Sequence, residues 1–308
     1  MTGPNDAPET PTTATDGKRA LWRDYLELTK PKVVLLIAFT AIVGMFLAVP
    51  GLPPLQALIW GTLGIWLAAA SAATINHVID QRIDGEMART RHRPMPTGAV
   101  TEVGALCFAF ALGLASMLIL VLLVNSLTAA LTFSSLIGYA IVYTLWLKRA
   151  TPQNIVIGGA AGAAPPVLGW AAVTNAIDPN ALLLFLIIFT WTPPHFWALA
   201  VARRDEYAKV GMPMLPVIYG VELTRLHILL YTVLLVVVTT LPFLTRMSGL
   251  IYLLSALILN SVFLVYSWKL WTRPQPEMPM QTFRWSINYL GLLFLALLVD
   301  HYWLIHVE

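Results

Sequence analysis

Long apolar segments recur along the chain and constrain its fold more than any other feature. Nine of them approach the roughly 20 residues that a helix needs to cross the hydrocarbon core of a bilayer. Charged residues make up only 11% of the chain, against about 25% in a typical soluble domain. We therefore predict an all-α polytopic membrane protein of about nine transmembrane helices, with the lipid bilayer as its main partner. The segments are 33–49, 55–79, 103–123, 127–147, 154–173, 181–202, 224–244, 250–271 and 287–305.

The segment 154–173 is less regular than the others. Its stretch from Gly158 to Pro166 consists of glycine and alanine and ends in two prolines. Small residues allow close contact between helices, and proline bends or breaks a helix. The first 20 residues are rich in Pro, Thr, Asp and Gly and lack the apolar core of a signal peptide. We expect a disordered tail (1–20) followed by a single transmembrane domain (21–308).

Basic residues indicate the orientation of the predicted helices. With nine spans, only Arg246 of the 19 Lys and Arg residues falls in the loops opposite the N-terminus. Because cytoplasmic loops carry an excess of Lys and Arg, we expect the N-terminus and the basic loops to be cytoplasmic. The net charge of +3 and the pI of about 9.0 follow from this asymmetry, and no nucleic-acid partner is indicated.

Three oxygen-bearing side chains follow one another at the cytoplasmic end of the second segment. Asn76, Asp80 and Asp84 are four residues apart, so on a helix they form one stripe about 80° wide and about 12 Å long. Mg²⁺ binds in proteins through one or two carboxylates together with water and substrate phosphates. We therefore interpret Asn76, Asp80 and Asp84 as metal ligands and the two aspartates also as catalytic residues.

The location of this stripe favours a bound cation. The C-terminal end of a helix carries the negative end of the helix dipole, and ionised groups are costly near the hydrocarbon edge. The alternative is an acidic helix end that is neutralised by its neighbours Arg82, Arg89 and Arg91.

Basic residues in several cytoplasmic loops are candidates for binding a diphosphate beside that metal. Arginines hold anions, and a metal-bridged diphosphate needs both kinds of group. A second polar loop, 203–209, follows the sixth segment. Four spans separate it from the first, which suggests two four-helix halves (33–147 and 154–271) and a ninth helix (287–305). The candidate diphosphate-binding residues are Arg89, Arg93, Lys148, Arg149, Arg203, Arg204 and Lys209.

Three further residues are functional candidates. Asp205 is an acidic candidate for catalysis in the second loop. The ring of Tyr143 can stabilise a forming carbocation, or it can be an ordinary interfacial tyrosine. His195 lies within the sixth segment, where an ionisable group is a functional candidate and haem iron is one partner for it. Its alternative is a neutral histidine bonded to the carbonyl groups freed at Pro193 and Pro194.

The chain resembles the UbiA-type intramembrane prenyltransferases, and among them the branch that acts on haem. The resemblance extends from about residue 21 to the C-terminus. The Asn76–Asp80–Asp84 stripe is shared by the superfamily, whereas the last three of the matching stretches are specific to the haem branch. The stretches are Leu28–Val33, Asn76–Pro96, Leu147–Gly159, Thr192–Ala200 and Gly211–Pro216.

The resemblance implies a UbiA-type bundle in the inner membrane of a bacterium, with its active site facing the cytoplasm. It implies transfer of farnesyl from farnesyl diphosphate to a vinyl group of heme B, with Mg²⁺ as cofactor. Water captures the resulting cation, so that the product, heme O, carries a hydroxyethylfarnesyl side chain. Handover of heme O to a heme A synthase or a terminal oxidase is also implied.

One departure from the family pattern concerns the second loop. Many superfamily members have a second Asp-x-x-x-Asp motif there, whose two aspartates fall on Arg203 and Tyr207 in this chain. Either Asp205 or Glu206 replaces them, or Arg203 holds the diphosphate directly and Tyr207 hydrogen-bonds it. We favour the arginine version.

Two other functions compete with haem farnesylation. Prenylation of a quinone precursor such as 4-hydroxybenzoate would favour an intact second motif and no histidine at position 195. The second competing function is that of a transporter or a non-catalytic haem-binding membrane protein. Transporters tend to place ionisable groups near the midplane of the membrane, whereas here they gather at one surface.

Overall fold

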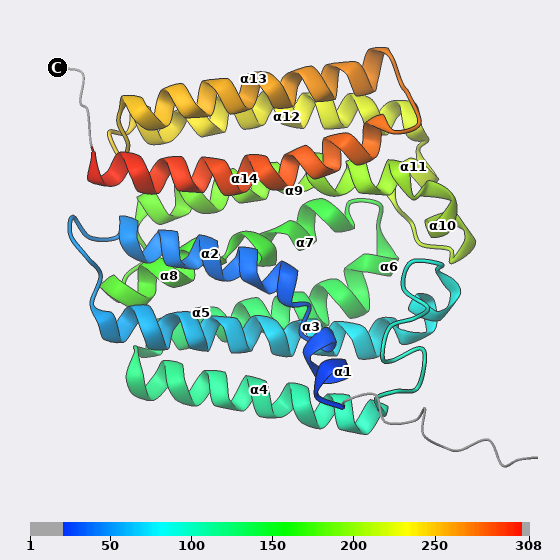
Figure 1. Cartoon of the computed structure of the whole chain (residues 1–308), viewed down its shortest axis with the longest axis horizontal. Helices are drawn as coiled ribbons and strands as arrows, with labels where there is room; N and C mark the ends of the chain where they lie inside the picture. Colours follow the sequence, from blue (N-terminus) through cyan, green and yellow to red (C-terminus); the bar gives the residue numbers. More distant parts are fainter. Residues whose placement is uncertain (1–20, 304–308) are drawn as a thin grey trace, which may run out of the picture.

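The computed structural model describes residues 21–303, and every regular element within that range is a helix. The predicted tail, residues 1–20, lies outside the described residues. The long helices run side by side, with α12 and α13 at one edge of the bundle and α4 at the opposite edge (Figure 1). The long elements are α2 (Pro31–Leu47), η1 (Ala57–Gly61) with α3 (Thr62–Glu86), α4 (Glu102–Leu123), α5 (Ser126–Ile137) with η2 (Gly138–Leu147) and α6 (Lys148–Ala150), α7 (Asn154–Ala163) with α8 (Pro165–Thr174), α9 (Pro179–Ala202), α12 (Val221–Leu244), α13 (Leu250–Thr272) and α14 (Met278–Tyr302).

The predicted number of spans is confirmed for the described part of the chain. Eight helical segments within residues 21–303 are long and apolar enough to cross a membrane. A ninth span is reached when the short helix α1 (Leu21–Leu28) and α2, bent by 54° against each other, are counted as one. The protein is therefore a multi-pass membrane protein, as its apolar segments predict.

Polar residues at the turns start several of these helices. Thr101 accepts a hydrogen bond from the backbone N–H of Gly104 at the start of α4, and Asn125 caps α5 in the same way. Asp178 caps α9, whose first residue is Pro179. These residue types satisfy the free N–H groups of a first helical turn, so the turn sequences determine where the spans begin.

The irregular fifth segment is broken, as predicted. α7 ends at Ala163 and α8 begins at Pro165, so the span consists of two helices. α8 packs closely on α2: a Cβ added to Gly169 would lie 2.0 Å from the carbonyl oxygen of Ala41, within α2. Because α2 and α8 belong to different predicted halves, the two halves interlock at this crossing. The division into halves stays a prediction.

The functional loops gather at one end of the bundle. Four segments lie at the right-hand end in Figure 1, opposite the C-terminal end of α14: the loop that follows α3, α6, α10 (Arg204–Lys209) and α11 (Leu215–Ile218). α3 reaches this end because it continues as one helix to Glu86, seven residues beyond the predicted apolar segment. It stops there because Met87 is extended, with φ −94° and ψ 128°.

Candidate active site

The stripe predicted on the second span lies on one helix, α3, and is buried. Asn76, Asp80 and Asp84 are 5%, 4% and 5% exposed. The Asn76 side-chain amide donates a hydrogen bond of 2.9 Å to Asp80 Oδ2. Two carboxylates are therefore held in a poorly hydrated place, where an ionised group is stable only beside a cation.

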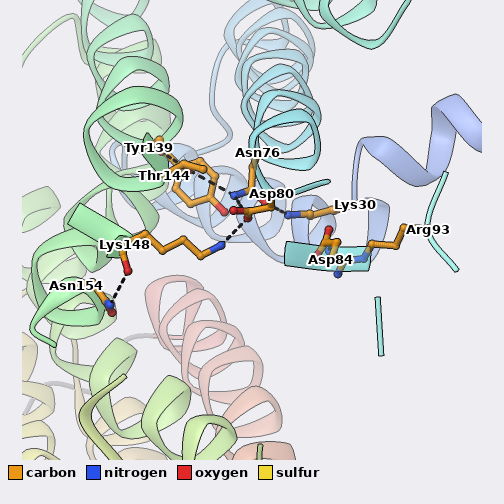
Figure 2. A network of polar contacts seen from close by, with 9 residues as sticks. All are labelled: Lys30, Asn76, Asp80, Asp84, Arg93, Tyr139, Thr144, Lys148 and Asn154. Atoms are coloured by element: carbon orange, nitrogen blue, oxygen red, sulfur yellow. Dashed lines mark hydrogen bonds and ion pairs between the residues drawn. The ribbon is translucent and has the colours of Figure 1, made fainter. Parts of the chain in front are cut away.

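Three basic side chains from different parts of the chain surround the stripe (Figure 2). Lys148 Nζ lies 2.5 Å from Asp80 Oδ2, and Arg93 Nη1 lies 2.7 Å from Asp84 Oδ2. Lys30 donates to Asn76 Oδ1, and it approaches from the side opposite Lys148. Among the described residues, Lys30 alone of these three pairs with no carboxylate. Three basic side chains thus face two carboxylates, so basic groups outnumber acidic ones at this site.

The predicted neutralising partners of the aspartates differ from the observed ones. Arg82, Arg89 and Arg91 are exposed and make no ion pair with either aspartate within the described chain. Arg93 and Lys148 make those pairs instead, and only Arg93 is near in sequence. The two aspartates are therefore not neutralised by the arginines nearest to them in the sequence, as the alternative interpretation expected.

One oxygen of the site has no partner. Asp80 Oδ1 is buried and makes no hydrogen bond with any described residue. Such an orphaned carboxylate oxygen is costly, and a cation is the group that would satisfy it. Within residues 21–303, no three His, Cys, Asp or Glu side chains cluster as metal ligands. The donor set fits Mg²⁺, which completes its shell with water and substrate phosphate.

Lys30 is a site residue to which the sequence patterns assign no role. It lies in the kink between α1 and α2, with φ 49°, a backbone conformation that residues with a side chain seldom adopt. Burial lowers its pKa to about 7, and the nearby charges of Arg93 and Lys148 act in the same direction. Its only sequence signal is its place in the Leu28–Val33 stretch.

A π-helical segment, η2, lines the site opposite α3. Thr144 Oγ1 donates 2.8 Å to the carbonyl of Tyr139 and lies 3.4 Å from the Asn76 amide nitrogen. Tyr143 stacks on Tyr139, with ring centroids 5.5 Å apart. Its ring is pressed on α7, where a Cβ on Gly158 would lie 2.1 Å from a ring carbon. Wide helical turns of this kind occur often at functional sites, and the sequence does not reveal them.

The second loop faces the first one through Tyr207. Burial raises the pKa of Tyr207, while the guanidinium groups of Arg89, Arg203 and Arg93 act against that rise. Tyr207 therefore lies within electrostatic range of arginines from both loops. Arg203 Nη1 pairs with Glu206 Oε1 at 2.7 Å.

Other predicted residues of the loops face outward. The side chain of Asp205 is 89% exposed and lies 3.7 Å from Arg204, so its surroundings do not support a catalytic role. Arg204 also donates to the carbonyl of Pro216 at 3.1 Å. Arg149 and Lys209 are exposed. The roles of these residues stay predictions.

His195 is buried on α9, against α14. Its Nδ1 lies 2.6 Å from the hydroxyl oxygen of Ser286. The partner is therefore a side chain of another helix, and not a carbonyl group freed at Pro193 or Pro194 as the alternative interpretation expected. No sequence pattern points to Ser286.

The sequence profile of the UbiA prenyltransferase family matches residues 37–298 of the chain. The chain belongs to the UbiA prenyltransferase family. Membership in this family makes the protein a prenyltransferase. The resemblance seen in the sequence is thereby confirmed.

Curated relatives of this UbiA prenyltransferase cover nearly its whole length. It is 59% identical to a protoheme IX farnesyltransferase from Methylococcus capsulatus, over 94% of this chain and 99% of that protein. It is 62% identical to a protoheme IX farnesyltransferase from Alkalilimnicola ehrlichii, over 91% and 92%.

Solved structures share the fold. Digeranylgeranylglyceryl phosphate synthase superposes with a TM-score of 0.77 at 19% identity, covering 92% of this chain and 99% of that one. A UbiA homolog from Archaeoglobus fulgidus, bound to DMAPP and Mg²⁺, gives a TM-score of 0.64 at 18% identity, over 89% and 99%. These likenesses establish the UbiA-type bundle that the sequence predicts.

Proposed function

We propose that this prenyltransferase transfers farnesyl from farnesyl diphosphate to a vinyl group of heme B, giving heme O and diphosphate. The excess of cations over carboxylates around α3 is the main support for a diphosphate substrate. Within residues 21–303, Arg93 and Lys148 pair with Asp84 and Asp80, Lys30 pairs with no carboxylate, and one buried oxygen of Asp80 has no partner. An anion that brings its own divalent cation would satisfy both features.

Haem as the acceptor is supported by the relatives. Proteins named protoheme IX farnesyltransferase are about 60% identical over more than nine-tenths of the chain. The buried His195 offers an iron ligand of the kind found in many haem proteins. Neither feature favours a quinone precursor as the acceptor.

Residues of α3 and basic side chains around it hold the metal and the diphosphate in this proposal. Asn76, Asp80 and Asp84 would hold Mg²⁺; the UbiA homolog from Archaeoglobus fulgidus, which shares the fold, is bound to DMAPP and Mg²⁺. Bound there, Mg²⁺ supplies Lewis-acid stabilisation of the leaving diphosphate. Lys30, Arg93 and Lys148 bind the diphosphate oxygens, and Arg89 and Arg203 reach them from the rim, next to Tyr207.

The transfer then needs little covalent participation from the protein. The C–O bond of farnesyl diphosphate breaks, and its electron pair leaves with the diphosphate, whose added charge Lys30, Arg93 and Lys148 stabilise. The vinyl π electrons of heme B form the new bond to the farnesyl carbon. Water adds to the resulting cation and releases a proton, which gives the hydroxyl group of the product. The stacked rings of Tyr139 and Tyr143 flank the site and stabilise positive charge near the diphosphate.

The proposal includes the setting of the enzyme. The basic loops would face the cytoplasm from the inner membrane of a bacterium, because positive loops are retained there. Farnesyl diphosphate would then enter from the cytoplasm and the bilayer. Heme O would pass within the membrane to a heme A synthase or a terminal oxidase.

A reconstitution experiment tests this function. The purified full-length protein in nanodiscs receives heme B, farnesyl diphosphate and Mg²⁺, and the extracted pigment is analysed by chromatography and mass spectrometry. We expect a more hydrophobic haem that carries farnesyl and one added water. A parallel reaction with 4-hydroxybenzoate in place of heme B should give no product. Prenylated 4-hydroxybenzoate with unmodified haem would overturn the proposal.

A further inference from the structure

Ser286, on α14, joins two residues of α9. It is fully buried, with 0% of its surface exposed. Its backbone carbonyl accepts a hydrogen bond of 2.8 Å from Trp191 Nε1. Its hydroxyl oxygen lies 2.6 Å from His195 Nδ1, one helical turn further along α9. The two helices are therefore clamped at a single serine.

The hydrogen bonds of this serine favour one tautomer of His195. Ser286 Oγ lies 2.7 Å from the carbonyl oxygen of Phe283, which can accept its one proton. When the hydroxyl group donates there, its oxygen accepts from the imidazole and Nδ1 carries the proton. In a neutral imidazole, Nε2 consequently keeps a free lone pair. Among the described residues, Nε2 has no hydrogen-bond partner.

Two aromatic rings hold the plane of the same imidazole. Trp191 stacks on His195 with centroids 4.2 Å apart and an interplanar angle of 17°. Phe283 stacks on it at 4.6 Å and 24°. Stacked rings oppose tilting of the imidazole, and the bond to Ser286 opposes a flip about its long axis. The direction of the Nε2 lone pair is thus fixed before any ligand binds.

We propose that Ser286 is a positioning residue that presents His195 Nε2 as an axial ligand to the iron of the haem substrate. This inference rests on the proposed function, in which haem is the acceptor. A histidine that ligates a metal usually donates its other N–H to a neighbouring group, which sets its tautomer and orientation. Ser286, its bond to Phe283 and the stacked rings provide that arrangement.

A serine at this position is also compatible with release of the haem product from His195. A carboxylate partner would pull on the Nδ1 proton and make the imidazole a stronger iron ligand. A hydroxyl group that is itself donating to a carbonyl is a neutral and weaker acceptor. The iron bond is then strong enough to orient the porphyrin, and weak enough to release the product.

The first test needs no haem. The full-length protein is labelled with ¹⁵N-histidine, and the imidazole signals of His195 are identified by their loss in His195→Ala. We expect Nδ1 protonated and Nε2 unprotonated in the wild type, and a mixture of tautomers in Ser286→Ala. Ser286→Thr, which keeps the hydroxyl, should restore the single tautomer. A protonated Nε2 in the wild type would overturn the inference.

The second test is a haem titration followed by the Soret band and by resonance Raman spectroscopy of the iron–histidine bond. We expect about tenfold weaker haem binding in Ser286→Ala, together with an altered iron–histidine band. Thr282→Val is the matched control, because it removes another buried hydroxyl of α14 that bonds only within the helix, to Met278. Melting temperatures of all variants show whether each one folds.

The outcomes separate this inference from the proposed function. If His195→Ala loses haem affinity and Ser286→Ala does not, the positioning role of Ser286 is wrong while haem ligation stands. If His195→Ala binds haem like the wild type and still forms heme O, both His195 and Ser286 lose their roles and farnesyl transfer stands. If neither the wild type nor any variant forms heme O, the proposed function itself fails.

Discussion

At the scale of single residues, the buried carboxylates of α3 are stable because cations from elsewhere in the chain reach them. Asp80 depends on Lys148, and Asp84 depends on Arg93. A buried charge whose partner is removed becomes costly, by about 3–5 kcal/mol. The same carboxylates are proposed to hold Mg²⁺, so a substitution there changes both the stability and the chemistry. Isosteric changes separate the two effects best.

Asp80→Asn tests the metal and catalytic assignment. The amide keeps the size of the side chain and one accepting oxygen but loses the charge that attracts a cation. We expect heme O formation to fall by about 100-fold or more, with the protein still folded in detergent. Asp205→Asn is measured beside it, because the exposed carboxylate of Asp205 touches only Arg204. A larger loss in Asp205→Asn than in Asp80→Asn would place the catalytic acid in the second loop.

Lys30→Met tests the unpaired cation. Because Lys30 neutralises no carboxylate in the described chain, its removal should weaken the binding of farnesyl diphosphate by about 10- to 100-fold. Haem affinity should stay as in the wild type. Calorimetric titration with farnesyl diphosphate and Mg²⁺ measures the first effect, and Lys30→Arg should recover part of it. Unchanged affinity in Lys30→Met would remove Lys30 from the diphosphate site.

At the scale of elements, two irregular helices shape the site. η2 is π-helical, which brings Thr144 within reach of Asn76 and leads into Lys148. α7 and α8 break at Ala164, and α8 then crosses α2 so closely that backbone touches backbone. A Cβ on Gly44 would lie 2.3 Å from the carbonyl oxygen of Pro166. Small residues at a helix crossing are needed here for a steric reason.

Gly169→Ala tests the crossing of α2 and α8. The new methyl group would meet the carbonyl oxygen of Ala41 at 2.0 Å, so one helix must shift. We expect a loss of stability of about 1–3 kcal/mol, seen as a lower melting temperature in detergent. Gly162→Ala is the matched control in α7, since no atom lies within 4 Å of the added Cβ. Equal melting temperatures for the two variants would contradict the close crossing.

At the scale of the whole molecule, the polar chemistry lies at one end of an apolar bundle. The C-terminal end of α3, the loop after it, α6 and α10 share that end (Figure 1). In the proposed function, the charged diphosphate leaves at this end of the bundle. The basic loops at this end also carry the expected orientation signal. The basic residues of the candidate site are therefore also the residues that predict the orientation of the helices in the membrane.

Cysteine labelling tests the proposed orientation. The single cysteine, Cys107, is replaced by serine, and a new cysteine is placed at His92 or at Thr245, both exposed and at opposite ends of the bundle. In intact cells, a membrane-impermeant maleimide should label Thr245→Cys and not His92→Cys. After cell lysis, both variants should react. The reverse pattern in intact cells would place the N-terminus and the active site outside the cytoplasm.

Local patterns in the sequence determined the spans, the break near Pro165 and the stripe Asn76–Asp80–Asp84. Each of these depends on neighbours within one helix: the length of an apolar run, the steric effect of proline and the 3.6-residue period. These features are encoded over a few turns, so they survive whatever the helices pack against. The stripe could therefore be placed correctly on α3 before its partners were known.

Only the tertiary structure decided which residues complete the site. Lys30 meets Asn76 across 46 positions, Lys148 meets Asp80 across 68, and Ser286 meets His195 across 91. Such pairs depend on how each helix is rotated against its neighbour, and here on the kink at Lys30 and the π-helical turns of η2. The same packing turns Asp205 toward solvent. Helical periodicity fixes the face of a residue on its own helix, and tertiary packing decides what that face meets.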